Sequence, residues 1–227
     1  MNRSRPIVFH SARRLGSAEL FRVYQRLRER FGHQRWWPGE TPFEVAVGAI
    51  LTQNTAWTNV EKAITNLKRE RLLRPRALDR ISLRRLEKAL KPSGYFRVKA
   101  VRLKHFVGFL LRRYGGSMER MRREPVLKLR EALLGVNGIG RETADSILLY
   151  ACGKPIFVID AYTRRIFGRH RLLPADSDYD GWRRCFERAL PKRGSLYNDY
   201  HAQIVRLGKE FCRPRPLCQG CPLKPYL

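Results

Sequence analysis

The residues with the clearest chemical potential lie between Leu133 and Arg164. Gly138 and Gly140 form a predicted tight turn directly before a predicted helix. Backbone N–H groups in the first turn of a helix have no partner within it and point outward, which suits a phosphate. Further along, Asp160 precedes another predicted helix, whose macrodipole favours the ionised carboxylate. The stretch therefore combines an anion-binding turn with an ionised acid.

The glycine turn has three interpretations. It is a corner between packed helices, a dinucleotide-binding turn, or a helix-hairpin-helix element that grips DNA phosphate through backbone N–H groups. The dinucleotide interpretation is weak, because Thr143 stands where a third glycine belongs and the preceding segment has helical periodicity. The charge of the chain favours the third interpretation.

A second group of chemically useful residues is aromatic. Trp36, Trp37 and Trp57 are three of only four tryptophans in the chain, and the adjacent pair lies with Pro38 in a loop rich in proline and glycine. Indole faces attract cations. An adjacent pair in such a loop is hard to explain as core, whereas Trp57 falls on an apolar helical stripe and also fits an ordinary core position.

The amino-acid composition indicates which kind of partner the protein binds. The chain has 227 residues, of which 43% are hydrophobic, so it can bury a real core. Its 47 Lys and Arg against 20 Asp and Glu give a net charge of +27, which predicts a polyanionic partner and above all nucleic acid. No apolar run reaches membrane-spanning length, and the basic N-terminus has no apolar segment typical of a secretory signal. We therefore expect no membrane association.

The elements that must position these residues are helical. Apolar residues recur with helical spacing in the ranges 17–31, 43–50, 57–67, 82–90, 98–113, 127–134, 142–151, 161–167, 182–190 and 200–211. No segment alternates polar and apolar residues for long enough to predict a strand. The predicted class is all-α.

Several segments resemble the endonuclease III superfamily of DNA glycosylases, with its helix-hairpin-helix and Gly/Pro-Asp signature. Within it, the sequence is most similar to the endonuclease III-like 3-methyladenine DNA glycosylases. The shared motifs are WWP (36–38), LTQNT followed by an aromatic residue (51–57), PSGY and KA.RL (92–103), and GIG.E.AD.IL.Y.C.K (138–154). The resemblance implies two helical domains with DNA in a cleft between them: a six-helix barrel domain over 35–154, and a second domain made of 1–34 with 155–227.

The resemblance also implies catalytic roles. Asp160 matches the essential aspartate of the family, and an ionised carboxylate beside C1′ stabilises an oxocarbenium-like transition state or helps to deprotonate water. A plain helix N-cap is the alternative. Glu142 stands where bifunctional members carry the lysine that forms a Schiff base, which a carboxylate cannot do. Lys154 is a nearby amine, but nothing in the sequence places it at the site.

The same resemblance assigns the binding residues. Trp36, Trp37, Pro38 and Trp57 would line the pocket for a base flipped out of the duplex. Gln53 would probe or fill the gap that the flipped nucleotide leaves, with a solvated helix residue as the alternative. The hairpin residues Gly138, Ile139, Gly140 and Arg141 would contact DNA.

Five cysteines indicate a metal or cluster site in a reducing compartment rather than a disulfide framework. Cys212, Cys218 and Cys221 match three of the four ligands of the family's [4Fe–4S] loop, and the fourth position is Leu227. A cluster with a non-cysteine ligand, a zinc site completed by water or His201, and a decayed site remain open.

The sequence thus predicts a monofunctional base-excision glycosylase that hydrolyses the glycosidic bond of alkylated purines in double-stranded DNA. The alternatives are a bifunctional glycosylase/AP lyase acting on oxidised pyrimidines and a non-catalytic helix-hairpin-helix DNA-binding protein. We expect a monomer of bacterial type, cytoplasmic and associated with the nucleoid.

Overall fold

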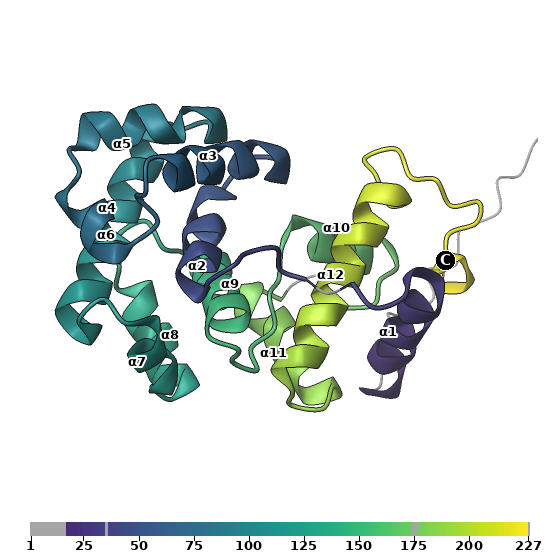
Figure 1. Ribbon diagram of the computed structural model, residues 1–227. Coiled ribbons are helices and arrows are strands. Elements are labelled where there is room, and N and C mark those ends of the chain that lie inside the picture. The colour runs from purple at the N-terminus through teal and green to yellow at the C-terminus, as the bar shows by residue number, and fades with distance from the viewer. Residues whose placement is uncertain (1–16, 35, 174–176, 227) are drawn as a thin grey trace, which may run out of the picture. The chain divides into compact units, whose positions relative to one another are not determined.

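The computed structural model describes residues 17–34, 36–173 and 177–226. All regular elements in these residues are helical, which confirms the all-α prediction (Figure 1). The contacts divide the described chain into two compact units, one of residues 36–158 with 192–199, the other of residues 17–34, 159–191 and 200–226. None of the helices in the described ranges combines the length and apolar character that a membrane span requires.

The unit of residues 36–158 and 192–199 carries the aromatic loop and the glycine turn. Its elements are α2 (Pro42–Leu51), α3 (Trp57–Arg69), α4 (Pro75–Arg80), α5 (Leu83–Leu90), the 3₁₀ turn η1 (Lys91–Ser93), α6 (Phe96–Tyr114), α7 (Met118–Arg123), α8 (Val126–Leu134), α9 (Arg141–Ser146) and the π-helical turn η2 (Ile147–Ala151).

Helix α2 forms the centre of this unit. Thr41 caps it by accepting a hydrogen bond from the Glu44 N–H at 3.1 Å, and Pro42 occupies its first turn, where no N–H is needed. Every residue from Phe43 to Leu51 is buried, because α3, α6, α9 and η2 all pack against the helix. Apart from Glu44, the residues from Phe43 to Leu51 are apolar or glycine, as is expected of a helix in a core.

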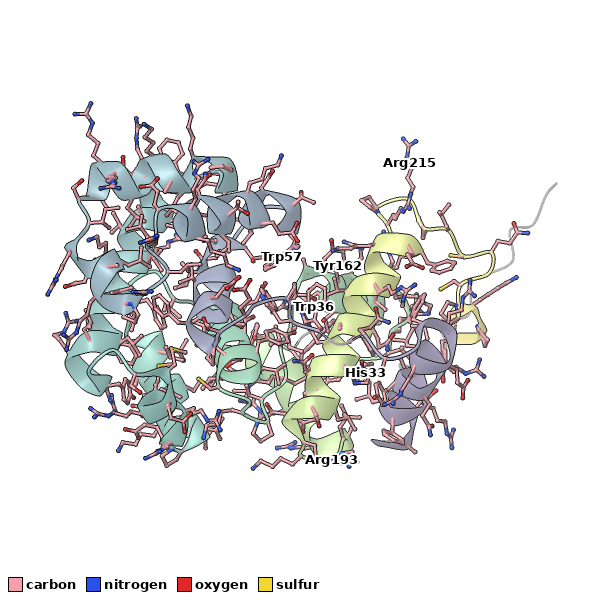
Figure 2. All side chains as sticks on the ribbon, in the orientation of Figure 1. His33, Trp36, Trp57, Tyr162, Arg193 and Arg215 are labelled. Atoms are coloured by element: carbon pink, nitrogen blue, oxygen red, sulfur yellow. The ribbon has the colours of Figure 1, made fainter. Side chains whose placement is uncertain are left out.

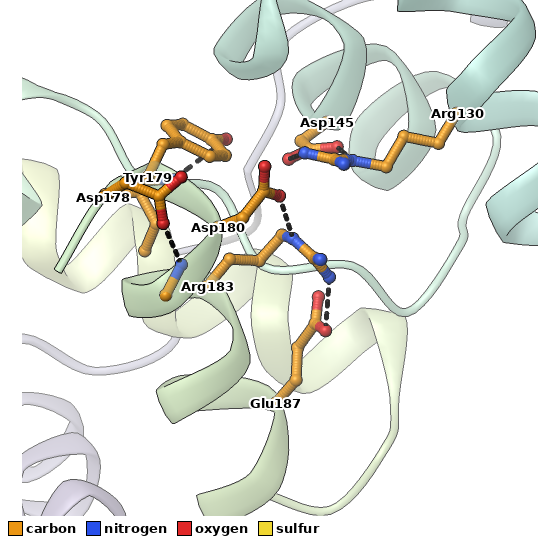
Figure 3. A network of polar contacts seen from close by, with 9 residues as sticks. Arg130, Asp145, Asp178, Tyr179, Asp180, Arg183 and Glu187 are labelled. Atoms are coloured by element: carbon orange, nitrogen blue, oxygen red, sulfur yellow. Dashed lines mark hydrogen bonds and ion pairs between the residues drawn. The ribbon is translucent and has the colours of Figure 1, made fainter.

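The two helices that flank the glycine turn are held together by an ion pair. Arg130 of α8 donates from Nε and Nη2 to the two carboxylate oxygens of Asp145 in α9, at 2.6 and 3.1 Å (Figure 3). Asp145 is fully buried. A bidentate pair of this kind fixes both distance and orientation, so it sets the angle at which the turn is presented.

The other unit carries Asp160. It contains α1 (Ser17–Phe31), α10 (Ala161–Arg169), α11 (Tyr179–Ala189), the 3₁₀ turn η3 (Lys224–Tyr226) and α12 (Gly194–Glu210), whose first residues, up to Asp199, belong to the first unit. Its core is aromatic: Tyr200 of α12 packs against Tyr24 of α1 with ring centroids 5.1 Å apart, and Phe167 of α10 against Phe186 of α11 at 4.9 Å. On α11, Arg183 pairs with Asp180 and Glu187 (Figure 3).

The structure adds details that the sequence pattern missed. Helices α4 and α7 have six residues each and were not predicted, because they are too short to show a period. Over the range predicted as a six-helix barrel, the described residues form the eight α-helices α2 to α9 together with the turns η1 and η2. The contact-based units divide after Val158, and the domain boundary after Lys154 that the resemblance implies stays a prediction. The intervening Phe157 is buried against Tyr197, at 5.6 Å between ring centroids.

Candidate active site

Asp160 is the N-cap of α10, as its place in the sequence predicted. Its Oδ1 accepts hydrogen bonds from the backbone N–H of Thr163 at 2.7 Å and from the hydroxyl of the same residue at 2.8 Å. The backbone at Asp160 is extended, which is typical of a capping residue. One carboxylate oxygen is therefore committed to holding the start of the helix.

The second oxygen of Asp160 faces a buried imidazole. The Nε2 atom of His201 lies 3.5 Å from Oδ2, and the two side chains are only 6% and 13% exposed. Burial raises the pKa of Asp160, but the imidazole of His201 and the two donors of Thr163 outweigh this effect. The pKa of Asp160 therefore lies below its ordinary value, and the carboxylate is ionised at neutral pH.

His201 was considered in the sequence as a zinc ligand, and the structure corrects that interpretation. Its ring lies beside Asp160. Among the residues that the structure describes, no group of three or more His, Cys, Asp or Glu side chains is arranged to hold a metal ion. His201 lies on α12, where it is 5% exposed and directly follows Tyr200 of the aromatic core.

The tryptophans form a cluster within the other unit. The Trp37 ring packs edge-on against Trp57, with centroids 5.0 Å apart and an interplanar angle of 86°, and edge-on against Trp36 at 5.7 Å. Tyr150 of η2 packs on Trp37 at 4.8 Å. Gly48 of α2 forms the floor, since an added Cβ would lie 3.5 Å from atoms of both Trp37 and Trp57. The sequence did not single out Tyr150, although it falls within the shared motif.

Trp57 is also held through its indole nitrogen. Its Nε1 donates to the carboxylate of Glu61 one turn along α3, at 2.8 Å, and Figure 2 shows Trp57 on that helix. Trp57, Glu61 and Pro38 line a pocket of about 500 Å³, together with Glu40, Glu44 and Lys68. Trp36 and Trp37 do not line it. Carboxylates therefore outnumber cations around this pocket, although the chain as a whole is strongly basic.

The glycine turn has the geometry that its residues suggested. Gly138 adopts φ +86°, which favours glycine, and a Cβ there would collide with the near end of the Arg102 side chain, within 2.8 Å of Cδ and closer still to Cγ. Gly140 is the N-cap of α9 with φ −85°, and a Cβ added there would have nothing within 4 Å. The two glycines therefore serve different purposes: Gly138 allows close packing, while Gly140 leaves the surface bare.

Gln53 lies against the turn rather than in solvent. Its amide nitrogen donates to the Gly138 carbonyl at 3.1 Å and to the Thr143 hydroxyl at 2.8 Å, and its oxygen accepts from the Arg102 guanidinium. These contacts join the end of α2, α6 and both sides of the turn. The predicted solvated alternative for Gln53 is therefore wrong, whereas its role toward DNA stays a prediction. Arg102 had no signal beyond its place in a basic run.

The remaining turn residues differ in exposure. The side chain of Ile139 is 4% exposed, and its N–H donates to the Val136 carbonyl at 3.0 Å, so Ile139 contributes to packing. Arg141 and Glu142, the first residues of α9, are exposed. Arg141 and Glu142 belong to the same unit as the tryptophan cluster. Asp160 and His201 belong to the other unit.

Of the three cysteines near the C-terminus, Cys212 contacts two arginines. Cys212 is buried, with its sulfur 3.4 Å from Nη1 of Arg169 and its carbonyl accepting from Nε of Arg165 at 2.7 Å. Cys218 and Cys221 are half-buried. The predicted fourth position, Leu227, lies outside the described residues. Three thiols, one of them bonded to a guanidinium, do not fit the four-thiolate set of a [4Fe–4S] cluster.

The family model for HhH-GPD superfamily base excision DNA repair proteins matches residues 47–192, well over half of the chain, and the match includes Gln53, Trp57, the glycine turn and Asp160. The chain belongs to this superfamily. It is a base-excision repair DNA glycosylase, and the predicted helix-hairpin-helix and Gly/Pro-Asp element is confirmed.

Relatives of this glycosylase cover nearly its whole length. A Methanocaldococcus jannaschii protein, whose name marks it provisionally as a DNA repair glycosylase, is 45% identical over 91% of this chain and 94% of its own. A solved structure of Helicobacter pylori 3-methyladenine DNA glycosylase bound to 1,N6-ethenoadenine is 30% identical, covers 86% of this chain and 98% of that one, and has a TM-score of 0.75. An endonuclease III–DNA complex at 21% identity, covering 93% and 95%, shares the fold with a TM-score of 0.79.

Proposed function

We propose that this glycosylase hydrolyses the N-glycosidic bond of alkylated purines with water as the nucleophile and leaves the abasic strand intact. The observation that carries the proposal is Glu142. It lies on the exposed first turn of α9, at the position where the resemblance puts the lysine of bifunctional members. A carboxylate has no amine to attack C1′, so the Schiff base on which strand cleavage depends does not form.

The proposed chemistry uses Asp160 as an anion beside the sugar. The bond between C1′ and the purine nitrogen breaks, and its electron pair neutralises the positive charge of the alkylated base. The ionised carboxylate stabilises the developing oxocarbenium charge at C1′. A water molecule adds to C1′ and loses a proton, by way of Asp160 or directly, to solvent. No step passes through a metal or cluster, since the thiols present do not fit one.

Recognition of the base is assigned to the tryptophan cluster. Alkylation at a ring nitrogen makes a purine cationic, and cations are attracted to indole faces. The packing of Trp37 on Tyr150 and against Trp57 presents a fixed aromatic surface from one unit. The 30% identical neighbour whose structure holds an ethenoadenine supports a modified-purine substrate for this chain.

Affinity for duplex DNA is assigned to the glycine turn and the net charge. The bare surface at Gly140 and the exposed Arg141 suit a phosphate, and the charge of +27 supplies long-range attraction. We propose that the protein acts as a monomer in the cytoplasm of a bacterial-type cell, on the nucleoid.

The proposal is tested with two duplex oligonucleotides that each carry one defined lesion, either 7-methylguanine or an oxidised pyrimidine. An unmodified duplex is the control. Released base is measured by chromatography, and strand breaks are counted before and after alkali. We expect release of the alkylated purine, with breaks only after alkali. Asp160→Asn serves as the control, since it should bind DNA and release no base.

Two results would overturn the proposal. Strand cleavage without alkali, or a protein–DNA adduct trapped by borohydride, would show a lyase. Release of the oxidised pyrimidine in preference to the methylated purine would assign the chain to the other substrate class. Binding without base release from any duplex would instead favour the non-catalytic interpretation.

A further inference from the structure

The two oxygens of Asp160 have different surroundings. Oδ1 holds the start of α10 through both donors of Thr163. Oδ2 takes no part in this cap and lies 3.5 Å from Nε2 of His201. The hydrogen bonds to Oδ1 therefore fix the orientation of the carboxylate, and His201 lies beside Oδ2, the oxygen that takes no part in the cap.

His201 reaches this oxygen from a different helix. It lies on α12, is 5% exposed, and comes directly after Tyr200, whose buried ring packs on Tyr24 and whose hydroxyl donates to the Leu20 carbonyl at 2.8 Å. The helix is therefore held in place independently of Asp160. A buried imidazole is costly unless a partner satisfies it, and a leucine would fill a purely apolar position without that cost.

We propose that His201 is a positioning residue for the reaction: it orients Oδ2 of Asp160 and keeps that oxygen available for C1′ and the attacking water. The inference rests on the proposed function in that Asp160 is the catalytic carboxylate. It assigns a role to a residue that is separated from Asp160 by forty-one positions and that the sequence offered only as a metal ligand.

The groups around the pair come from three helices, and the His201 imidazole is the one that faces Oδ2 of Asp160 at 3.5 Å. From α10, Thr163 supplies two neutral donors. From α11, the Tyr179 hydroxyl lies against the neighbouring residue, accepting from the Ile159 N–H at 3.4 Å, and the Arg164 guanidinium lies over the Tyr179 ring. From α12, His201 lowers the pKa of Asp160 against the effect of burial. Removing the imidazole should therefore raise that pKa.

The test compares wild type with His201→Gln and His201→Asn, which keep a hydrogen-bond donor but remove the imidazole. Gln203→Ala is the matched control, because Gln203 is a buried polar residue of α12 whose amide bonds to the Gly32 carbonyl instead. Single-turnover base release is followed from acid to neutral pH, and the Asp160 carboxyl is titrated by carbon-13 NMR in each protein.

We expect both His201 variants to move the acid limb of the rate profile and the NMR midpoint of Asp160 to higher pH together. Each unit of rise lowers the rate about tenfold at pH values below both midpoints. Duplex affinity should stay unchanged. Gln203→Ala should lower the melting temperature and leave both midpoints where they are in wild type.

The inference is overturned if the His201 variants keep the wild-type acid limb and carboxyl midpoint, whatever their melting temperature. Because the NMR titration needs no substrate, it decides the matter even when the lesion is wrongly chosen. Absence of base release by wild type would instead refute the proposed function, and the two failures are therefore distinguishable.

Discussion

Replacing the two glycines of the hairpin one at a time separates packing from DNA contact. Gly138→Ala puts a methyl group at φ +86° and into the first carbons of Arg102. A left-handed conformation costs a non-glycine residue about 1–2 kcal/mol, and overpacking adds about 1–3 kcal/mol. The overpacking cost applies in full because the near end of the Arg102 side chain cannot move aside. Together the two costs destabilise the folded protein by about 2–5 kcal/mol.

Gly140→Ala is the matched control. The backbone there is extended, with φ −85° and ψ 178°, and nothing lies within 4 Å of the added methyl group. A substitution at such a compatible position stabilises a protein by about 0.4–1 kcal/mol through the unfolded chain. If the hairpin lies on a phosphate, however, the methyl group occupies the space that the phosphate needs.

The assay is thermal melting followed by circular dichroism, paired with fluorescence anisotropy on a labelled duplex at fixed salt. At about 2–4 °C per kcal/mol for a chain of this size, Gly138→Ala should lower the melting temperature by about 4–20 °C. Gly140→Ala should melt at or slightly above the wild-type temperature and bind the duplex more weakly. Wild-type melting of Gly138→Ala would refute the packing argument, and wild-type affinity of Gly140→Ala would remove the hairpin from the DNA interface.

Three further predictions concern the chemistry. Asp160→Asn should abolish base release with little change in melting temperature, because asparagine still caps α10; retained activity in a base-release assay would show that the acid is only a cap. Glu142→Lys should give an adduct that borohydride traps on a lesion duplex and wild type does not, and no adduct from the variant would mean that position 142 does not reach C1′. Trp36→Ala or Trp37→Ala should lower kcat/KM for cationic lesions about ten- to hundredfold, from about 1–3 kcal/mol of stacking. The loss should be smaller for neutral hypoxanthine, and equal losses accompanied by a lower melting temperature would show that the tryptophans are core residues.

Local signals in the sequence were sufficient for most of the helices but not for all of their starts: α11 begins at Tyr179 and α12 at Gly194, ahead of the predicted positions 182 and 200. Apolar spacing predicted the long helices, since a period of 3.6 residues shows itself over three or more turns. The helix predicted over 82–90 is α5, and the first residue of that range, Ser82, is its N-cap. Asp160 was predicted to precede a helix, and it caps α10. In contrast, α4 and α7 are too short to show a period, and the sequence did not reveal them.

The sequence by itself determined the all-α class, the glycine turn and the position of Asp160 at the start of a helix, because each of these depends on neighbouring residues or on a contiguous motif. Only the tertiary structure decided that Arg102 lies under Gly138, that Gln53 bonds the turn across 85 positions, and that His201 faces Asp160. These contacts join helices far apart in the chain. The residues near each contact partner in the sequence carry no signal of these contacts, since the packing of whole helices brings the side chains together.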